Sequence, residues 1–205
     1  MPKKDNSHIY IKSIINIRSD RMKIIGINTS PRENGNARIA LVKALEAAEA
    51  KGAETEIFDT NKMNIGACQA DNYCKAHEGK CPVDDDMQKI YRAIEEADGV
   101  ILASPVYFFD VCAQAKLVID RMYAYFQSPF VETYGQKKFS LIATQGTPDA
   151  DAFKDVLQVQ ANAFGFLGFE VCDVAILTDN NVPGAIESKD DQIDLAKKVG
   201  ENIAN

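Results

Sequence analysis

The residues best suited to chemistry lie in one short stretch, residues 23–37, with the sequence KIIGINTSPRENGNA. Its apolar start predicts a buried strand, and the spacing of apolar residues after position 37 predicts a helix. A helix N-terminus has unpaired N–H groups and a partial positive charge, so the polar loop between them could hold a phosphate. An ordinary strand-to-helix turn would use the same residue types. The loop offers hydroxyl, guanidinium, amide and glycine groups from Ser30, Arg32, Asn34, Gly35 and Asn36.

The length and composition of the chain predict one globular domain. The 205 residues suit a single domain at residues 22–205, preceded by an extension or arm at residues 1–21. A net charge of −7 argues against nucleic acid or an anionic membrane as the main partner, and no apolar run is long enough to cross a bilayer. Residues 1–21 do not form a convincing signal peptide, so we expect a cytoplasmic protein whose five cysteines are thiols or ligands rather than disulfides.

Strand and helix patterns alternate along the chain. The strand patterns lie at residues 23–29, 54–59, 99–103, 138–144 and 169–177, and the helical patterns lie at about 36–51, 87–97, 111–126, 150–167 and 189–204. This alternation predicts a doubly wound α/β sandwich of three layers, with a parallel five-stranded sheet. One common strand order of such sheets is 2-1-3-4-5. In that order a ligand binds beyond the carboxyl ends of the first and third strands. The phosphate loop and the segment SPVYF at residues 104–108 would meet there.

Three motifs together resemble the NADPH-dependent FMN reductase family, and within it the iron–sulfur flavoprotein branch. They are SPRENGNA at residues 30–37, DDDM at 84–87 and ASPVYFFDVCAQAKLVIDR at 103–121, and the resemblance extends over residues 22–204. It implies a flavodoxin-like fold with the strand order 2-1-3-4-5, bound FMN and NAD(P)H as co-substrate. The implied FMN contacts are phosphate ligands (Ser30, Arg32, Asn34, Gly35, Asn36, Ala37), a ring wall (Pro105, Val106, Tyr107, Phe108) and a polar edge (Thr144, Gln145, Gly146).

Physical chemistry agrees with these implied contacts. A phosphate dianion suits a helix N-terminus with one arginine nearby, and a flat flavin ring suits an apolar and aromatic wall. The same aromatic residues could also be core residues at the entry to a helix. We expect no catalytic side chain, because hydride transfer belongs to the flavin. No second nucleotide-binding motif is visible, so we expect the nicotinamide to stack on the flavin and leave before the acceptor binds.

Three cysteines lie in one loop, with the spacing C-x5-C-x6-C at Cys68, Cys74 and Cys81. The iron–sulfur branch carries C-x2-C-x2-C-x5-C here, whereas this chain has Asp71 in place of the second cysteine and one extra residue before Cys81. Because a cubane cluster normally takes four thiolates, we favour a loop without metal that covers the flavin or packs against a neighbouring subunit. A cluster completed by Asp71 or His77, or a zinc site, is the alternative.

The remaining polar and cysteine residues have structural interpretations. We interpret Asp120 and Arg121 as a structural ion pair rather than a subunit contact. We interpret residues 84–86 as the cap of the following helix rather than a metal site. Cys112 and Cys172 are interpreted as small core residues.

Three functions follow from the sequence. The leading hypothesis is an FMN-dependent NAD(P)H oxidoreductase that passes hydride to FMN and then reduces a small-molecule acceptor or a redox protein. The alternative is an FMN or iron–sulfur flavoprotein that carries electrons between proteins. A third hypothesis is a phosphate-binding or regulatory module that has lost the flavin. The resemblance also implies a homodimer or homotetramer.

Overall fold

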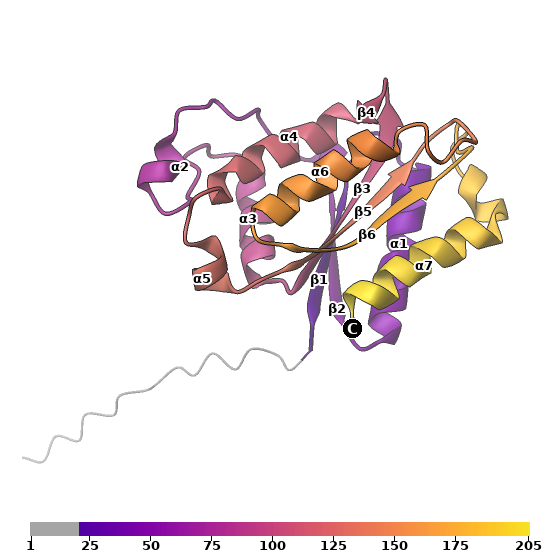
Figure 1. Ribbon diagram of the computed structural model, residues 1–205, viewed down its shortest axis with the longest axis horizontal. Helices are drawn as coiled ribbons and strands as arrows, with labels where there is room; N and C mark the ends of the chain where they lie inside the picture. The colour runs from indigo at the N-terminus through magenta and orange to yellow at the C-terminus, as the bar shows by residue number, and fades with distance from the viewer. Residues whose placement is uncertain (1–20) are drawn as a thin grey trace, which may run out of the picture.

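The computed structural model describes residues 21–205, so the predicted arm at residues 1–21 lies outside it except for Arg21. A twisted sheet forms the middle layer and helices cover both of its faces (Figure 1). The strands are β1 (Lys23–Asn28), β2 (Glu54–Asp59), β3 (Gly99–Tyr107), β4 (Asp110–Val111), β5 (Lys138–Thr144) and β6 (Glu170–Leu177). The α-helices are α1 (Asn36–Ala50), α2 (Tyr73–Ala76), α3 (Met87–Glu96), α4 (Ala113–Arg121), α5 (Phe130–Tyr134), α6 (Lys154–Phe166) and α7 (Asp190–Ile203).

The sheet has the predicted strand order. Five parallel strands run β2-β1-β3-β5-β6, and the two-residue β4 pairs antiparallel with the end of β3. Because β5 and β6 are the fourth and fifth parallel strands, the order 2-1-3-4-5 is confirmed. The carboxyl ends of β1 and β3 are therefore neighbours, as the phosphate-site hypothesis requires.

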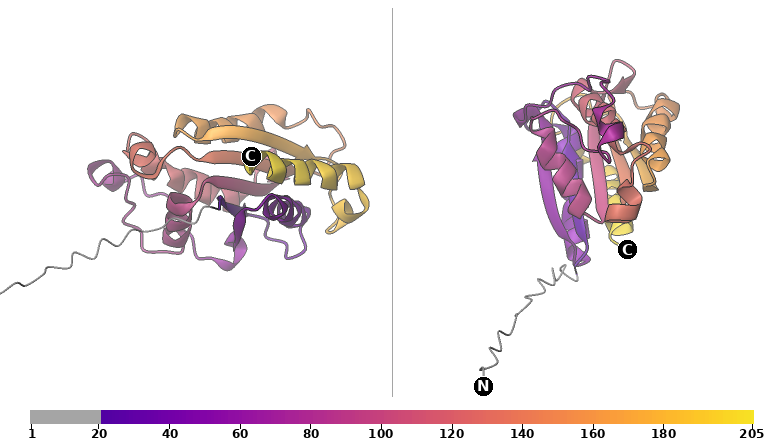
Figure 2. Two further views of the ribbon diagram at one scale, coloured as in Figure 1. Left: turned by 90° about the horizontal axis from the view of Figure 1, so that it is seen from below. Right: turned by 90° about the vertical axis from the view of Figure 1, so that its left-hand side faces the viewer.

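Two apolar layers hold the sandwich together. One face of the sheet packs against α3, α4 and α6, and the other packs against α1 and α7. Figure 2 shows these helices on opposite sides of the sheet when it is viewed edge-on. The contact between α1 and α7 needs a glycine, because a Cβ at Gly200 would overlap the carbonyl oxygen of Ala44. None of the helices in residues 21–205 combines the length and the apolar composition needed to span a membrane.

The main differences from the sequence prediction lie at element ends. The third parallel strand continues to Tyr107, because Val106 and Tyr107 pair with β4 in a tight hairpin that no alternation of apolar residues marks. The helix expected at 111–126 is α4 followed by a 3₁₀ turn, Met122–Tyr125. The short helices α2 and α5 were not predicted, since five residues or fewer show no helical period.

Candidate functional site

The carboxyl ends of β1, β3 and β5 and the loop after β6 surround one pocket. Most of the predicted site residues come together there, from segments far apart in the sequence. Asn34, Phe108 and Gln145 do not line it. The lining residues are Ser30, Arg32, Gly35, Asn36, Ala37, Pro105, Val106, Tyr107, Thr144, Gly146, Asn180 and Asn181.

The β1–α1 loop has the form of an anion cradle. Helix α1 begins after Gly35 with no side-chain cap and no acidic residue in its first turn. The loop is held in shape by hydrogen bonds from the Ser30 N–H to Asn28 Oδ1 (3.1 Å) and from the Arg32 N–H to Ser30 Oγ (3.3 Å). A Cβ at position 35 would overlap Ser30 Oγ, so only glycine leaves this space open. These residues fit a phosphate group, because the first N–H groups of a helix lack partners within it.

The side chain of Asn36 has a different role from the one expected. Its Nδ2 donates to the carbonyl oxygens of Asn180 (2.9 Å) and Val182 (2.8 Å), and its Oδ1 accepts from the Ile186 N–H (3.2 Å). Asn36 therefore fastens the loop after β6 to the start of α1. The prediction that its side chain offers a donor to a phosphate is wrong, because both amide protons bind this loop.

The pocket is small and partly open to solvent. Its volume is about 80 Å³, whereas cavities that enclose a whole ligand measure about 300–1,000 Å³. It can enclose a phosphate-sized anion, and a larger planar group would lie along the open rim. This rim is the apolar and aromatic part of the lining, formed by Pro105, Val106 and Tyr107, of which Pro105 is buried and Tyr107 is 39% exposed.

The three predicted residues outside the pocket are placed by identifiable contacts. Asn34 lines a neighbouring cavity that also contains Arg38 and Asp59. Gln145 is buried, and its Nε2 donates to the Asp149 carbonyl (2.6 Å), so its side chain orders the loop after β5. Phe108 is 96% exposed at a hairpin turn, so its ring does not form part of the pocket wall.

Two residues of the pocket were not predicted. Asn180 and Asn181 lie in the polar loop after β6 and close the pocket on the side of the phosphate loop. The guanidinium of Arg32 donates from Nη1 to the Asn181 carbonyl (3.0 Å), which places this positive charge at the pocket mouth. The sequence contained a signal, because this loop also follows a strand at the carboxyl edge of the sheet.

Asp59, the last residue of β2, stabilises the β1–α1 loop through hydrogen bonds. It accepts hydrogen bonds from Arg38 Nε (2.9 Å) and from Asn28 Nδ2 (2.8 Å), and Asn28 in turn holds Ser30. Burial alone would raise the pKa of Asp59, but these hydrogen bonds outweigh burial and hold its pKa below the usual value. Asp59 is therefore charged at neutral pH and fixes the loop electrostatically.

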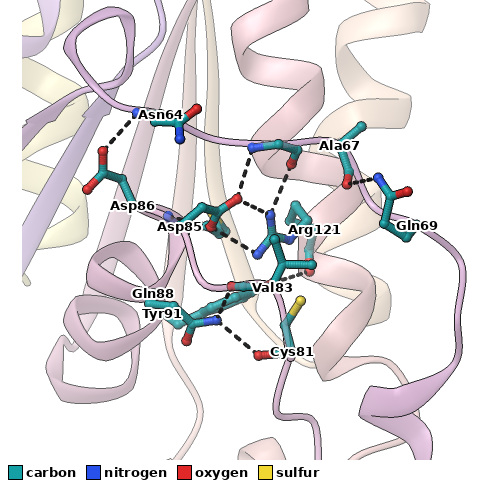
Figure 3. A network of polar contacts seen from close by, with 12 residues as sticks. Asn64, Ala67, Gln69, Cys81, Val83, Asp85, Asp86, Gln88, Tyr91 and Arg121 are labelled. Atoms are coloured by element: carbon teal, nitrogen blue, oxygen red, sulfur yellow. Dashed lines mark hydrogen bonds and ion pairs between the residues drawn. The ribbon is translucent and has the colours of Figure 1, made fainter.

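The cysteine-bearing loop is fastened by a buried ion pair (Figure 3). The side chain of Arg121 is fully buried, and its Nη1 and Nη2 contact the two carboxylate oxygens of Asp85 at 2.6 and 3.2 Å. Arg121 also donates to the Gly66 carbonyl (3.0 Å), and Asp85 accepts from the Gly66 and Met87 N–H groups (2.9 and 3.0 Å). Within residues 21–205 no partner is found for Arg121 Nε.

This pair corrects one interpretation of the sequence. Arg121 pairs with Asp85, whereas Asp120 pairs with Lys116 on the surface of α4. The cap predicted at residues 84–86 is confirmed in part, because Asp85 accepts the Met87 N–H at the start of α3. Burial alone would raise the pKa of Asp85, but the bonds from Arg121 and Gly66 hold its pKa below the usual value.

The cysteines do not assemble into a metal site. Across residues 21–205, no three side chains of His, Cys, Asp or Glu lie where they could hold a metal ion together. Cys74 is buried, while Cys68 and Cys81 are partly exposed, and all three are free thiols. The donors present do not fit an iron–sulfur cluster. Cys112 is buried as predicted, whereas Cys172 is only partly buried.

A family model and several relatives of known sequence match this chain over about half of its length or more. A family model described as NADPH-dependent FMN reductase matches residues 22–167. An iron–sulfur flavoprotein of Archaeoglobus fulgidus is 34% identical over 189 residues, which cover 89% of this chain and 79% of that protein. An iron–sulfur flavoprotein of Methanocaldococcus jannaschii is 46% identical over 100 residues, which cover 49% of this chain and 51% of that protein. The chain therefore matches only about half the length of that relative and of several others.

Solved structures share the fold. The NAD(P)H:quinone oxidoreductase from Methanothermobacter marburgensis superposes with a TM-score of 0.70 at 20% identity, covering 90% of this chain and 97% of that one. An FMN-dependent NADH-azoreductase from Bacillus anthracis, solved in complex with FMN, gives a TM-score of 0.63 at 15% identity, covering 89% of this chain and 100% of that one. With the family match over residues 22–167 and the Archaeoglobus relative, these findings lead to one conclusion: the chain belongs to the NADPH-dependent FMN reductase family.

Proposed function

We propose that this protein is an FMN-dependent NAD(P)H oxidoreductase that reduces a small-molecule acceptor or a redox protein. The observation that carries the proposal is the pocket at the switch point of the sheet. It joins an uncapped helix N-terminus, where only glycine fits at position 35, to an open apolar and aromatic rim. FMN combines the two groups that such a site would recognise, a phosphate and a flat conjugated ring.

Each part of the pocket has a proposed role. Gly35 and the first turn of α1 hold the phosphate, and the guanidinium of Arg32 adds a fixed positive charge at the pocket mouth. Pro105, Val106 and Tyr107 orient the ring along the rim. Bound FMN supplies the hydride chemistry, so the protein contributes orientation, electrostatics and access.

The polar edge of the ring would meet the loop after β5. Thr144 and Gly146 line the pocket there, and Thr144 is buried. The side chain of Gln145 shapes this loop through Asp149, so its proposed role is indirect. A cytoplasmic location and a homodimer or homotetramer belong to the same proposal and are supported by the family resemblance.

A spectroscopic titration tests the proposal. The purified protein is mixed with FMN, and the expected result is a flavin spectrum that stays with the protein through gel filtration. Addition of NADPH or NADH without air should bleach the flavin band. Initial rates with a quinone acceptor should give parallel lines, because the co-substrate leaves before the acceptor binds. Protein that takes up no FMN would favour the phosphate-binding module, and intersecting lines would contradict the ping-pong order.

An electron carrier is the second candidate, and the names of the relatives favour it. Several of them are called iron–sulfur flavoproteins. The discriminating measurement is turnover: a carrier would bind FMN but would not oxidise NAD(P)H at catalytic rates with small acceptors. Iron and sulfide assays on protein purified without air would test whether the cysteine loop holds a cluster.

A further inference from the structure

The turn between β3 and β4 has an unusual backbone. Its two central residues, Phe108 and Phe109, have φ angles of +43° and +75°. A two-residue hairpin with both central φ angles positive is normally built from Asn-Gly or Asp-Gly, because a Cβ disfavours this region. Among the non-glycine residues of the described chain, these are the only two neighbours that both have positive φ. A strained conformation of this kind points to a function for the residues that adopt it.

The two rings differ in their support. Phe109 packs edge-to-face on Phe153, with ring centroids 5.5 Å apart, just before α6. The next residue, Asp110, accepts a hydrogen bond from Gln160 Nε2 on α6 (3.1 Å). Phe108 meets Phe109 edge-to-face at 5.7 Å and is otherwise presented to solvent, with 96% of its surface exposed. The turn is therefore held in place by contacts to Phe153 and to Gln160 of α6. The Phe108 ring at its tip is exposed, so it contributes no hydrophobic stabilisation to the fold.

The tip lies beside the functional pocket. Tyr107 belongs to the pocket rim and pairs with Asp110 across the hairpin, so Phe108 is the next residue outward from the rim. Figure 1 shows this hairpin projecting beyond the carboxyl end of the sheet, next to the start of α6. Two exposed aromatic residues therefore follow one another at this end of the sheet, Tyr107 in the lining of the pocket and Phe108 at the tip of the hairpin.

We propose that Phe108, together with Tyr107, forms a stacking surface that selects planar conjugated acceptors such as naphthoquinones over small hydrophilic ones. This inference rests on the proposed function. Flat aromatic rings stack favourably on one another, and an exposed phenyl ring offers no hydrogen bond to a hydrophilic acceptor. The overall reaction is NAD(P)H + H⁺ + quinone → NAD(P)⁺ + hydroquinone. The nicotinamide gives up two electrons and one proton as hydride, and water supplies the second proton.

Three variants test Phe108. Phe108→Asn removes the ring but suits a positive φ, so the hairpin should fold at least as well. Phe108→Trp keeps a flat ring. Phe166→Gln is the matched control, because Phe166 is also an exposed aromatic residue (75%) but lies at the other end of α6 and does not line the pocket.

The measured quantity is a ratio of rates. FMN-loaded protein is reduced with dithionite and mixed in a stopped-flow instrument with 1,4-naphthoquinone or with ferricyanide. We expect Phe108→Asn to lower the naphthoquinone-to-ferricyanide ratio of second-order rate constants by about tenfold. Phe108→Trp and Phe166→Gln should keep the ratio within about twofold of the parent protein, because one keeps the ring and the other lies outside the pocket. Chemical reduction makes this result independent of whether NAD(P)H is the donor.

The contrary outcomes separate the two proposals. If Phe108→Asn leaves the ratio unchanged in protein that binds FMN and is bleached by NAD(P)H, this inference is overturned and the proposed function stands. If the ratio is unchanged and gel filtration shows that Phe108→Asn dissociates an oligomer, the turn is a contact to a second copy of the chain. Protein that takes up no FMN overturns both proposals.

Discussion

Two loops that follow neighbouring parallel strands use their polar groups in opposite ways. The loop after β1 leads into a helix with no side-chain cap, and its lining faces a pocket. The loop after β2, residues 60–86, binds to the protein itself: Asp85 is held by Arg121 and Gly66, and Lys75 Nζ donates to the carbonyls of Tyr123 (2.6 Å) and Phe126 (2.5 Å). The first loop leaves the start of α1 without a side-chain cap beside a pocket, whereas the polar side chains of the second loop bind to other parts of the protein.

The largest effect should come from breaking the second loop. Arg121→Ala leaves the carboxylate of Asp85 buried with no ion partner, and we expect a loss of about 3–5 kcal/mol in the free energy of unfolding. Urea unfolding followed by circular dichroism measures this. The matched control is Lys116→Ala, which removes an exposed pair on the same helix and should cost less than about 0.5 kcal/mol. Equal losses in the free energy of unfolding would show that the buried pair stabilises the protein no more than the exposed pair does.

The phosphate loop should respond in ligand affinity rather than in stability. Gly35→Ala places a Cβ against Ser30 Oγ in the cradle, and we expect FMN to bind about 100-fold more weakly, equivalent to about 2.7 kcal/mol. Quenching of FMN fluorescence measures the dissociation constant. Gly66→Ala is the control in the other loop, since the nearest atom to its Cβ would be Asp85 Oδ2 at an ordinary 3.5 Å. If Gly35→Ala binds FMN as tightly as the parent protein, the proposal that this loop holds the FMN phosphate is wrong.

A smaller effect should appear at Arg32, and it should depend on the phosphate. Arg32→Ala removes one positive charge from the pocket mouth, so FMN should bind about tenfold more weakly while riboflavin, which lacks the phosphate, should bind within about twofold of the parent protein. Lys62→Ala is the control, because this exposed cation lines the neighbouring cavity and not the pocket. Equal weakening for FMN and riboflavin would mean that Arg32 contacts the ring or only shapes the loop.

The fold could be predicted from the sequence because its signals are local and periodic. The apolar runs at 23–29 and 138–144 gave the strands β1 and β5 to within one residue at either end. The alternation of strands and helices predicted a parallel sheet with helices on both faces, and the family resemblance implied its strand order. Hairpin β3–β4 escaped prediction, because its turn is made by two phenylalanines where Asn or Gly would be expected.

The location of the site could be predicted from the sequence, but the contacts of several of its side chains could not. The rule that ligands bind at the switch point brought residues 30–37 and 105–107 to one pocket. The partner of Arg121 and the role of the Asn36 side chain depend on contacts 36 and about 150 residues away, which no spacing in the chain encodes. Side chains that can serve either a ligand or the protein cannot be assigned until the tertiary partners are known.

The smallest effect should lie at Asp59, which stands where the two loops meet. It ends β2 and reaches the phosphate loop through Asn28 and Arg38. Asp59→Asn removes the charge that Arg38 binds, and because the pair is partly exposed we expect a loss of about 1 kcal/mol in the free energy of unfolding at pH 7.

The pH dependence of that loss identifies its cause. The pKa of Asp59 is lower in the folded protein than its unfolded value of about 3.9, so its carboxylate stabilises the fold above that pH. The stabilisation is lost as the pH falls through the folded pKa. The difference between the parent protein and Asp59→Asn should therefore be constant from pH 7 to about pH 5 and should shrink below about pH 4. A difference that persists to pH 2 in urea unfolding would mean that packing, and not charge, joins the two loops at this residue.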